Sequence, residues 1–236
     1  MRTVRAASLT LLFGVLLAAA GCRGNASDTA TSNQQRPAQA AAPSQSVDAR
    51  PRIVALGDSL TAGLGLAESQ AYPALLQKKL DAEGYRFEVV NAGVSGDTSA
   101  GGLRRLDWAL DGDVRVLIVA LGANDGLRGL SAAEMKKNLD AIVQRAKERN
   151  IVVILAGMEA PPNYGPEYTA SFRQVYQDVA REQGVLLLPF LLDSVAGNSA
   201  LNQGDGIHPN ARGAEIIADA MWKVLHPVLD GMPAAS

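Results

Sequence analysis

Five short apolar runs recur along the chain, and the first four end in a polar or glycine-containing stretch. They are Ile53–Leu56, Phe87–Val90, Val114–Leu121, Ile151–Ala156 and Val185–Pro189. Short, continuous apolar runs of this kind are typical of strands that are buried on both faces, as in a parallel sheet. The pattern therefore predicts five parallel strands.

Between these runs, apolar residues recur every three or four positions, which is the spacing of one face of a helix. The clearest set is Met135, Leu139, Ile142, Val143 and Ala146. Alternation of strand and helix predicts an α/β protein of three layers, α/β/α. For five strands we expect the flavodoxin-like order 2-1-3-4-5, in which ligands bind between strands one and three.

The N-terminal residues do not follow this pattern. Arg2 and Arg5 precede a short apolar segment, Leu9–Ala20, and Cys22 follows directly after small residues. This arrangement is typical of an export signal, and it is shorter than the about 20 apolar residues of a transmembrane helix. The stretch resembles a bacterial lipoprotein signal, whose cleavage leaves the cysteine as a lipidated N-terminus. A plain secretory signal with an incidental Cys22 is the alternative.

These observations divide the chain into three expected regions. Residues 1–21 are the lipoprotein signal peptide, and residues 22–49, rich in Ala, Ser, Thr, Gln and Pro, are a flexible linker. Residues 50–236 form the folded domain. We expect an exported protein of the bacterial cell envelope, a periplasmic monomer held at a membrane by its lipid anchor.

Composition narrows the function classes. The 236 residues are 47% hydrophobic and 19% charged, with a formal net charge of −2, as in ordinary globular domains. Near-neutral charge gives no reason to expect nucleic acid as a partner. Two histidines and one cysteine nearly exclude a zinc site built from those residues. A flavodoxin-like cofactor carrier is disfavoured, because no G-x-G-x-x-G or P-loop follows the first strand.

The end of the first strand carries a candidate nucleophile. The strand runs into Gly57-Asp58-Ser59-Leu60, where the glycine allows a sharp turn. Ser59 would then lie at the carboxyl edge of the sheet, where ligands bind. A serine nucleophile needs a base within hydrogen-bond reach and a group that orients the base. His208 is the candidate base, and Asp205 is the candidate orienting acid.

Two further loops at the same edge offer hydrogen-bond donors. Gly96 follows the second strand and has an N–H that no side chain obstructs, and Asn124 follows the third strand and has an amide. With the N–H of Ser59 they would form an oxyanion hole, in which the loss of one donor costs about 10²–10³ in rate. We expect Asp58 and His226 to have structural roles.

Each feature also has a simpler explanation. Ser59 could cap the next helix, Asn124 could belong to an ordinary turn, and His208 could be a surface histidine. Their occurrence together at successive strand ends favours catalysis. The lipase-type elbow G-x-S-x-G is absent, because Thr61 stands at its last position, and an ordinary α/β-hydrolase is therefore disfavoured.

The stretches that carry Ser59, Gly96, Asn124 and the Asp205/His208 pair resemble the four conserved blocks of the SGNH, or GDSL, hydrolase superfamily, in the same order. Within the superfamily, four segments are most similar to the bacterial multifunctional thioesterase I / lysophospholipase / arylesterase group: residues 95–99, 122–129, 163–165 and 205–210. The resemblance implies that Ser59 is the nucleophile, His208 the base and Asp205 the acid, with Ser59, Gly96 and Asn124 as oxyanion donors. It also implies hydrolysis of carboxylic esters or thioesters without a metal or cofactor.

The expected substrates are medium-length acyl or aryl esters and lysophospholipids. Acyl-CoA is not expected as the natural substrate, because the export signal takes the protein away from the cytosol. Two alternatives remain open. One is a carbohydrate O-deacetylase with the same chemistry, and the other is a non-catalytic lipoprotein that binds a lipid or glycan.

Overall fold

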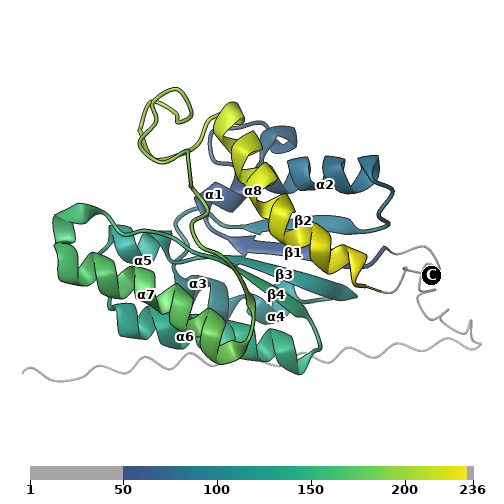
Figure 1. Ribbon diagram of the computed structural model, residues 1–236, viewed down its shortest axis with the longest axis horizontal. Coiled ribbons are helices and arrows are strands. Elements are labelled where there is room, and N and C mark those ends of the chain that lie inside the picture. The colour runs from purple at the N-terminus through teal and green to yellow at the C-terminus, as the bar shows by residue number, and fades with distance from the viewer. Residues whose placement is uncertain (1–49, 233–236) are drawn as a thin grey trace, which may run out of the picture. The chain divides into compact units, whose positions relative to one another are not determined.

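The computed structural model describes residues 50–232. At its centre lies a parallel sheet of five strands in the order β2-β1-β3-β4-β5 (Figure 1). The strands are β1 (Arg52–Gly57), β2 (Glu88–Gly93), β3 (Val114–Ala120), β4 (Val152–Ala156) and β5 (Leu186–Leu188). The predicted α/β class and the flavodoxin-like strand order are both confirmed.

Helices cover both faces of this sheet (Figure 1). On one face, α2 (Tyr72–Ala82) contacts α8 (Ala211–Asp230). On the other, α6 (Ala132–Glu148) contacts both α3 (Ser99–Arg104) and α7 (Pro166–Gln183). The shorter elements are α1 (Ser59–Ala62), α4 (Leu106–Ala109), α5 (Ala123–Leu127) and the 3-10 turns η1 (Glu68–Gln70) and η2 (Pro162–Tyr164).

The core forms where the apolar runs of β1, β3 and β4 lie between the two helical layers. Residues 53–56 of β1 and residues 116–119 of β3 are at most 1% exposed. The apolar face predicted for α6 is also buried, since its five residues are at most 1% exposed. Strands covered on both faces can be apolar throughout, which is why these runs show no alternation.

Two elements differ from the prediction. Strand β2 continues past Val90 to Gly93, because Asn91–Gly93 pair with Ala55–Gly57 of β1. Leu103, Leu106 and Leu110 have the spacing of one continuous helix, but the structure divides this stretch into α3 and α4 at Arg105. The side chain of Arg105 turns to the sheet, where backbone carbonyls accept its hydrogen bonds.

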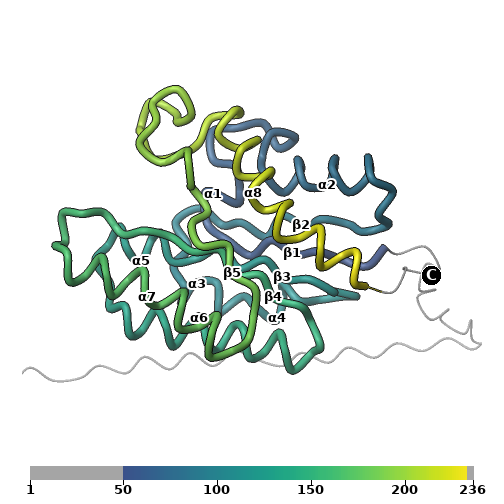
Figure 2. Tube along the Cα trace, in the orientation of Figure 1, coloured from purple at the N-terminus to yellow at the C-terminus, as the bar shows by residue number. Residues whose placement is uncertain are grey.

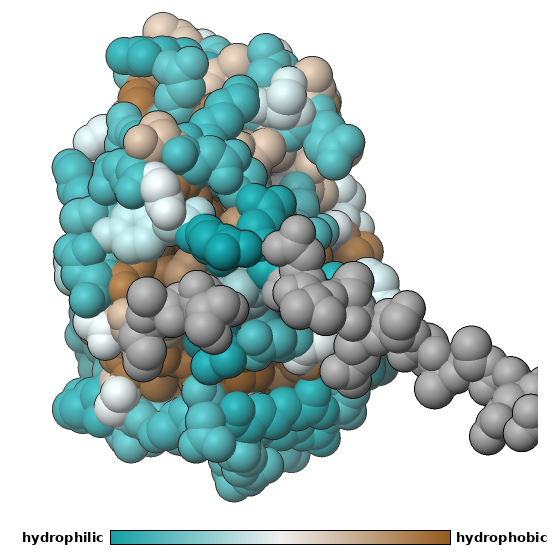
Figure 3. Space-filling model, turned by 90° about the vertical axis from the view of Figure 1, so that its right-hand side faces the viewer, coloured by the Kyte–Doolittle hydropathy of each residue, from teal (hydrophilic) through white to brown (hydrophobic). Residues whose placement is uncertain are grey.

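The sheet brings the site-bearing segments to its carboxyl edge. The long segment between β5 and α8 comes close to α1 there (Figure 2). The opposite edge carries the amino ends of the strands, and hydrophilic residues cover most of what is visible of it, with smaller apolar areas between them (Figure 3). Any functional cleft is therefore to be sought at the carboxyl edge.

The N-terminal predictions concern another part of the chain. The signal peptide 1–21, the linker 22–49 and the lipidation site Cys22 lie outside the described residues. Within residues 50–232, no helix has the length and apolar character needed to cross a membrane.

Candidate active site

Ser59 lies in a tight turn between β1 and α1. A Cβ atom on Gly57 would stand 1.9 Å from Thr61 Oγ1, so the turn requires glycine at that position. Asp58 caps α1, because its Oδ1 accepts a hydrogen bond from the Leu60 N–H at 3.0 Å. The simpler explanation of Ser59 as a helix cap is therefore wrong, and its hydroxyl is left for another partner.

That partner is His208, and Asp205 holds the histidine from its other side. Ser59 Oγ lies 2.9 Å from His208 Nε2, and His208 Nδ1 lies 2.6 Å from Asp205 Oδ2. A carboxylate only accepts hydrogen bonds, so the imidazole hydrogen belongs on Nδ1. Nε2 is then free to accept the proton of the serine hydroxyl.

Hydrogen bonds within its local turn keep the Asp205 carboxyl group ionised. Its Oδ1 accepts from the backbone N–H groups of Ile207 and His208 at 2.9 and 3.0 Å. These bonds and the one from the His208 side chain hold the pKa of the Asp205 carboxyl well below its usual range, with the His208 backbone N–H as the largest cause. Asp205 therefore keeps its charge, and because its side chain is 46% exposed, water also stabilises the ionised form.

The segment that carries the histidine is tied to the nucleophile turn by Gln203. Its backbone N–H donates to His208 O at 2.7 Å, and its side-chain amide donates to Leu64 O at 2.7 Å and Pro209 O at 2.9 Å. Gln203 belongs to no motif, and the sequence analysis missed it. It fixes His208 relative to the segment that follows Ser59.

Gly96 lies in the loop after β2 with a φ of 84°, a backbone conformation that favours glycine. A Cβ atom there would meet only Arg128 Nη2, at 3.7 Å, so backbone conformation and not space requires the glycine. Arg128 also donates to Gly96 O at 2.9 Å. The Val94 N–H bonds to Gly57 O at 3.0 Å, which fixes the start of this loop against β1.

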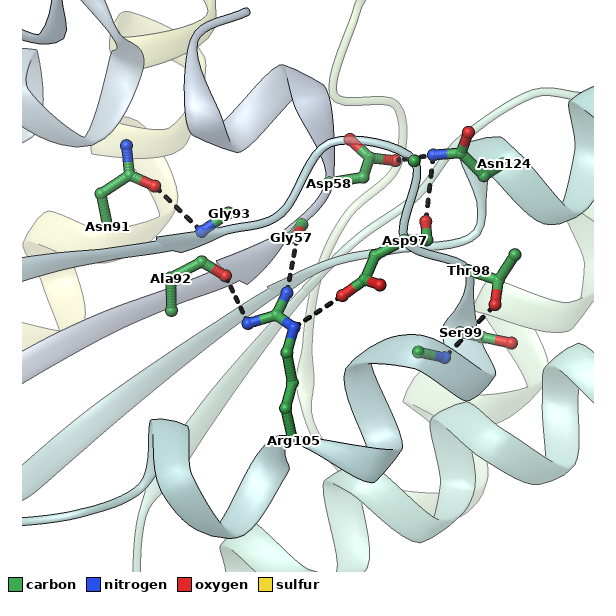
Figure 4. Close-up of polar contacts among 12 residues, drawn as sticks. Gly57, Asp58, Asn91, Ala92, Gly93, Asp97, Thr98, Ser99, Arg105 and Asn124 are labelled. Carbon is green, nitrogen blue, oxygen red and sulfur yellow. Dashed lines mark hydrogen bonds and ion pairs between the residues drawn. The ribbon is translucent and has the colours of Figure 1, made fainter.

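Asn124, in the first turn of α5, connects the nucleophile turn with the glycine loop. Its Nδ2 donates to Asp97 O at 3.0 Å and to Asp58 Oδ2 at 3.3 Å (Figure 4). Asp58 is only 1% exposed, and burial raises the pKa of its carboxyl to about 6, although the bonds from Leu60 and Asn124 act in the opposite direction. The expected structural role of Asp58 is confirmed by these bonds.

His226 lies near the end of α8, within 2.9 Å of Glu83, and its ring contacts those of Tyr85 and Trp222. It is absent from the lining of the cleft that holds His208. The expectation of a structural role agrees with this position.

Ser59, Gly96, Asn124 and His208 line one cleft of about 380 Å³. Most of its other lining side chains are apolar: Leu60, Leu64, Ala123, Leu127, Met158, Pro161, Leu192, Ala196 and Ile207. The loop after β4 also lines the cleft, through Met158, Glu159 and Pro161. An apolar cleft with a few convergent polar groups is the usual form of a small-molecule site. In the described part of the chain, no cluster of three or more His, Cys, Asp or Glu side chains is arranged to hold a metal ion.

A serine–histidine–carboxylate geometry at the carboxyl edge of a parallel α/β sheet is that of a serine hydrolase. Comparison with known proteins agrees with this class. Residues 55–216 match the model of the GDSL-like Lipase/Acylhydrolase family. The chain therefore belongs to this family, and it is a carboxylic ester hydrolase.

Individual relatives are similar over most of the described residues. Esterase TesA of Pseudomonas aeruginosa is 45% identical over 178 residues, which cover 75% of this chain and 89% of the relative. Thioesterase 1/protease 1/lysophospholipase L1 of Escherichia coli is 41% identical over 179 residues, 75% of this chain and 85% of the relative. The crystal structure of esterase EstA from Pseudoalteromonas sp., inhibited by monoethylphosphonate, matches with a TM-score of 0.73 and 37% identity, over 76% of this chain and 99% of EstA.

Proposed function

We propose that the protein hydrolyses acyl esters through an acyl-serine intermediate, with Ser59 as the nucleophile. The observation that carries the proposal is the continuous hydrogen-bond chain from Ser59 Oγ through His208 to Asp205, at 2.9 and 2.6 Å. Both distances are within the reach that nucleophile activation requires. A binding protein without turnover would have no need of this alignment.

In the first half of the reaction, Ser59 Oγ attacks the acyl carbonyl carbon while His208 Nε2 accepts the hydroxyl proton. The carboxylate of Asp205 stabilises the imidazolium that results. When the tetrahedral intermediate collapses, the bond to the leaving alcohol or thiol breaks, and His208 returns the proton to the leaving group. In the second half, water attacks the acyl-serine with His208 again as the base, and the acid product leaves.

The negative oxygen of each tetrahedral intermediate needs donors on the opposite side of the cleft. We assign this role to the backbone N–H groups of Ser59 and Gly96 and to the Asn124 amide, which all belong to residues that line the cleft. The Asn124 bond to Asp58, at 3.3 Å, is longer than its bond to Asp97 O, at 3.0 Å. The N–H directed at Asp58 is the one that we expect to turn to the oxyanion.

The cleft favours an acyl chain as the group that binds beside Ser59. Three of its apolar lining residues, Leu64, Leu127 and Ile207, are 47%, 43% and 48% exposed, so apolar surface continues from the cleft to its mouth. An amphiphile such as a lysophospholipid presents matching apolar surface. Medium-length acyl esters, aryl esters and lysophospholipids are therefore the proposed substrates, with thioesters as further substrates in vitro.

The experiment is hydrolysis of p-nitrophenyl esters from acetate to palmitate by the purified protein. Ser59→Ala is the test variant, and Ser171→Ala, an exposed serine of α7, is the matched control. We expect an optimum at medium chain length, loss of turnover in Ser59→Ala and retention of turnover in Ser171→Ala. A sharp preference for acetate would favour a carbohydrate O-deacetylase instead. Equal turnover in Ser59→Ala would overturn the proposal.

We further propose that the hydrolase domain spans residues 50–236 and is exported as a monomer anchored through Cys22. The family match starts at residue 55, after the region interpreted as signal and linker, which supports this order. The test is metabolic labelling with radioactive palmitate in a bacterial host, compared between the wild type and Cys22→Ser. Labelled wild type in the membrane fraction and unlabelled Cys22→Ser are expected. Unlabelled, soluble wild type would contradict the anchor, and a dimer on gel filtration would contradict the monomer.

A further inference from the structure

Arg105 lies between α3 and α4 and binds three separate parts of the sheet edge with one guanidinium group (Figure 4). Its Nε donates to Asp97 Oδ2 at 2.6 Å, its Nη1 to Ala92 O at 2.8 Å and its Nη2 to Gly57 O at 2.8 Å. Its side chain is 18% exposed. All three distances are in the range of strong, charge-assisted hydrogen bonds.

Each acceptor is next to a group that the proposed mechanism uses. Gly57 ends β1, two residues before Ser59, and Asp97 follows Gly96 directly. Asp97 also holds Asn124, because its backbone carbonyl accepts from Asn124 Nδ2 at 3.0 Å. One cation therefore connects the segments that carry all three proposed oxyanion donors.

The geometry requires arginine specifically. A guanidinium is planar and presents five N–H groups in a fixed fork, so it can bind two carbonyls and a carboxylate at once. An ammonium group on a flexible stem cannot reproduce those three directions. Gly101 leaves room for the Asp97 carboxylate, since a Cβ atom there would stand 2.4 Å from Asp97 Oδ1.

We propose that Arg105 is a positioning residue for the oxyanion hole. It makes no contact with substrate, since it is absent from the cleft lining, and acts by holding the Ser59 turn, the Gly96 loop and Asn124 in register. The inference rests on the proposed function of those three residues. Loose donors lower the rate because stabilisation of the oxyanion depends on donors that are fixed before the reaction.

The test compares Arg105→Met with Arg149→Met. Arg149 is a matched control, because it also binds an aspartate, Asp107 at 2.8 Å, and a backbone carbonyl, Leu110 O at 3.2 Å, but is absent from the cleft lining. For p-nitrophenyl butyrate we expect Arg105→Met to lower kcat by about 10–10²-fold with KM within about threefold, below the loss of a whole donor. Arg149→Met should lower the Tm while its kcat stays within about twofold of the wild type.

Two further variants separate positioning from general stability. Arg105→Lys should have an intermediate kcat, because lysine keeps the charge but loses the fork. In Arg105→Met/Asn124→Ala, the combined loss of kcat should be smaller than the product of the two single losses, since both changes act on the same oxyanion hole. Wild type and Ser59→Ala are measured first, so that failure of the proposed function is recognised separately.

Several outcomes would overturn the inference. One is a folded Arg105→Met whose kcat stays within about twofold of the wild type. Another is a double variant whose loss of kcat equals the product of the losses in Arg105→Met and Asn124→Ala. A third is a loss of kcat in Arg105→Met that is explained by the fraction of unfolded protein. If neither Arg105→Met nor Arg105→Lys folds, Arg105 is a residue of the fold and the inference is wrong.

Discussion

The two sides of the cleft are built in different ways. The proton-transfer side, Asp205 and His208, belongs to one exposed segment, and its carboxylate is oriented by N–H groups two and three residues away. The oxyanion side joins residues from the turn after β1, the loop after β2 and α5, and its carboxyl group, Asp58, is 1% exposed. The first side is local and solvated, and the second depends on long-range contacts inside the protein.

This difference indicates which substitutions should lower activity without lowering the stability of the fold. A substitution on the exposed side removes a proton carrier but few packing contacts, so it should lower activity at nearly constant stability. A substitution on the buried side leaves polar groups without partners, which costs stability as well as rate. The following predictions test this contrast.

The largest effect is expected for His208→Gln, which removes the base. We expect kcat to fall by about 10⁴–10⁶, because the serine then has no proton acceptor, while the Tm stays close to that of the wild type. Steady-state kinetics and calorimetry measure the two quantities. His226→Gln is the matched control, and it should retain nearly full activity because His226 is absent from the cleft lining. Similar activities for the two variants would contradict the assignment of the base.

The next largest effect on kcat is expected for Asp205→Asn. The amide can donate to His208 Nδ1 and so favours the wrong tautomer of the imidazole, and kcat should fall by about 10⁴. The Tm should change little, since the Asp205 side chain is 46% exposed. A large decrease in Tm would show that this side of the cleft is not separable from the fold.

Asn124→Ala tests the buried side. Loss of one oxyanion donor should lower kcat by about 10²–10³ with little change in KM. Unlike the two preceding variants, it should also lower the Tm, because Asp97 O and the buried Asp58 carboxyl each lose a hydrogen-bond partner. An unchanged Tm beside a reduced kcat would remove the distinction between the two sides.

The smallest effect is a pH dependence of stability from Asp58. Its pKa is about 6 in the folded protein against an ordinary value of 3.8 for aspartate, so the folded state holds the proton more tightly than the unfolded state. Stability from this group is therefore highest at low pH and is lost as the pH rises through about 6. We expect it to be about 2 kcal/mol lower at about pH 7.5 than at about pH 4.5. Urea unfolding of the wild type and Asp58→Asn at both pH values measures this contribution, and an unchanged difference between the two proteins would contradict it.

Sequence alone predicts the local side of the cleft well. The five strands follow from the apolar runs and their order from the alternation of strand and helix, and the contacts among Ser59, His208 and Asp205 follow from the residue types that nucleophile activation requires. These are properties of residue type and spacing, which a sequence displays directly.

The long-range side was only partly predicted. Gly96 and Asn124 were found by motif, but Arg105 was not. Gln203, which ties the histidine segment of the other side to Leu64, was missed as well. Their hydrogen bonds end on backbone carbonyls, which every residue possesses, so no pattern of residue types marks the acceptors. The extension of β2 to Gly93 was missed for a similar reason, since Asn91 and Gly93 are poor strand formers that pair only because β1 lies beside them.

The most direct test of the account is the site of covalent modification by an alkyl fluorophosphonate, mapped by peptide mass spectrometry. We predict a single adduct on Ser59, formed rapidly in the wild type and absent from Ser59→Ala, with formation strongly slowed in His208→Gln. Ser95 is an internal control, because it is a second serine that lines the same cleft. An adduct on Ser95, or no adduct on a protein that hydrolyses esters, would contradict the assignment of Ser59 as the nucleophile.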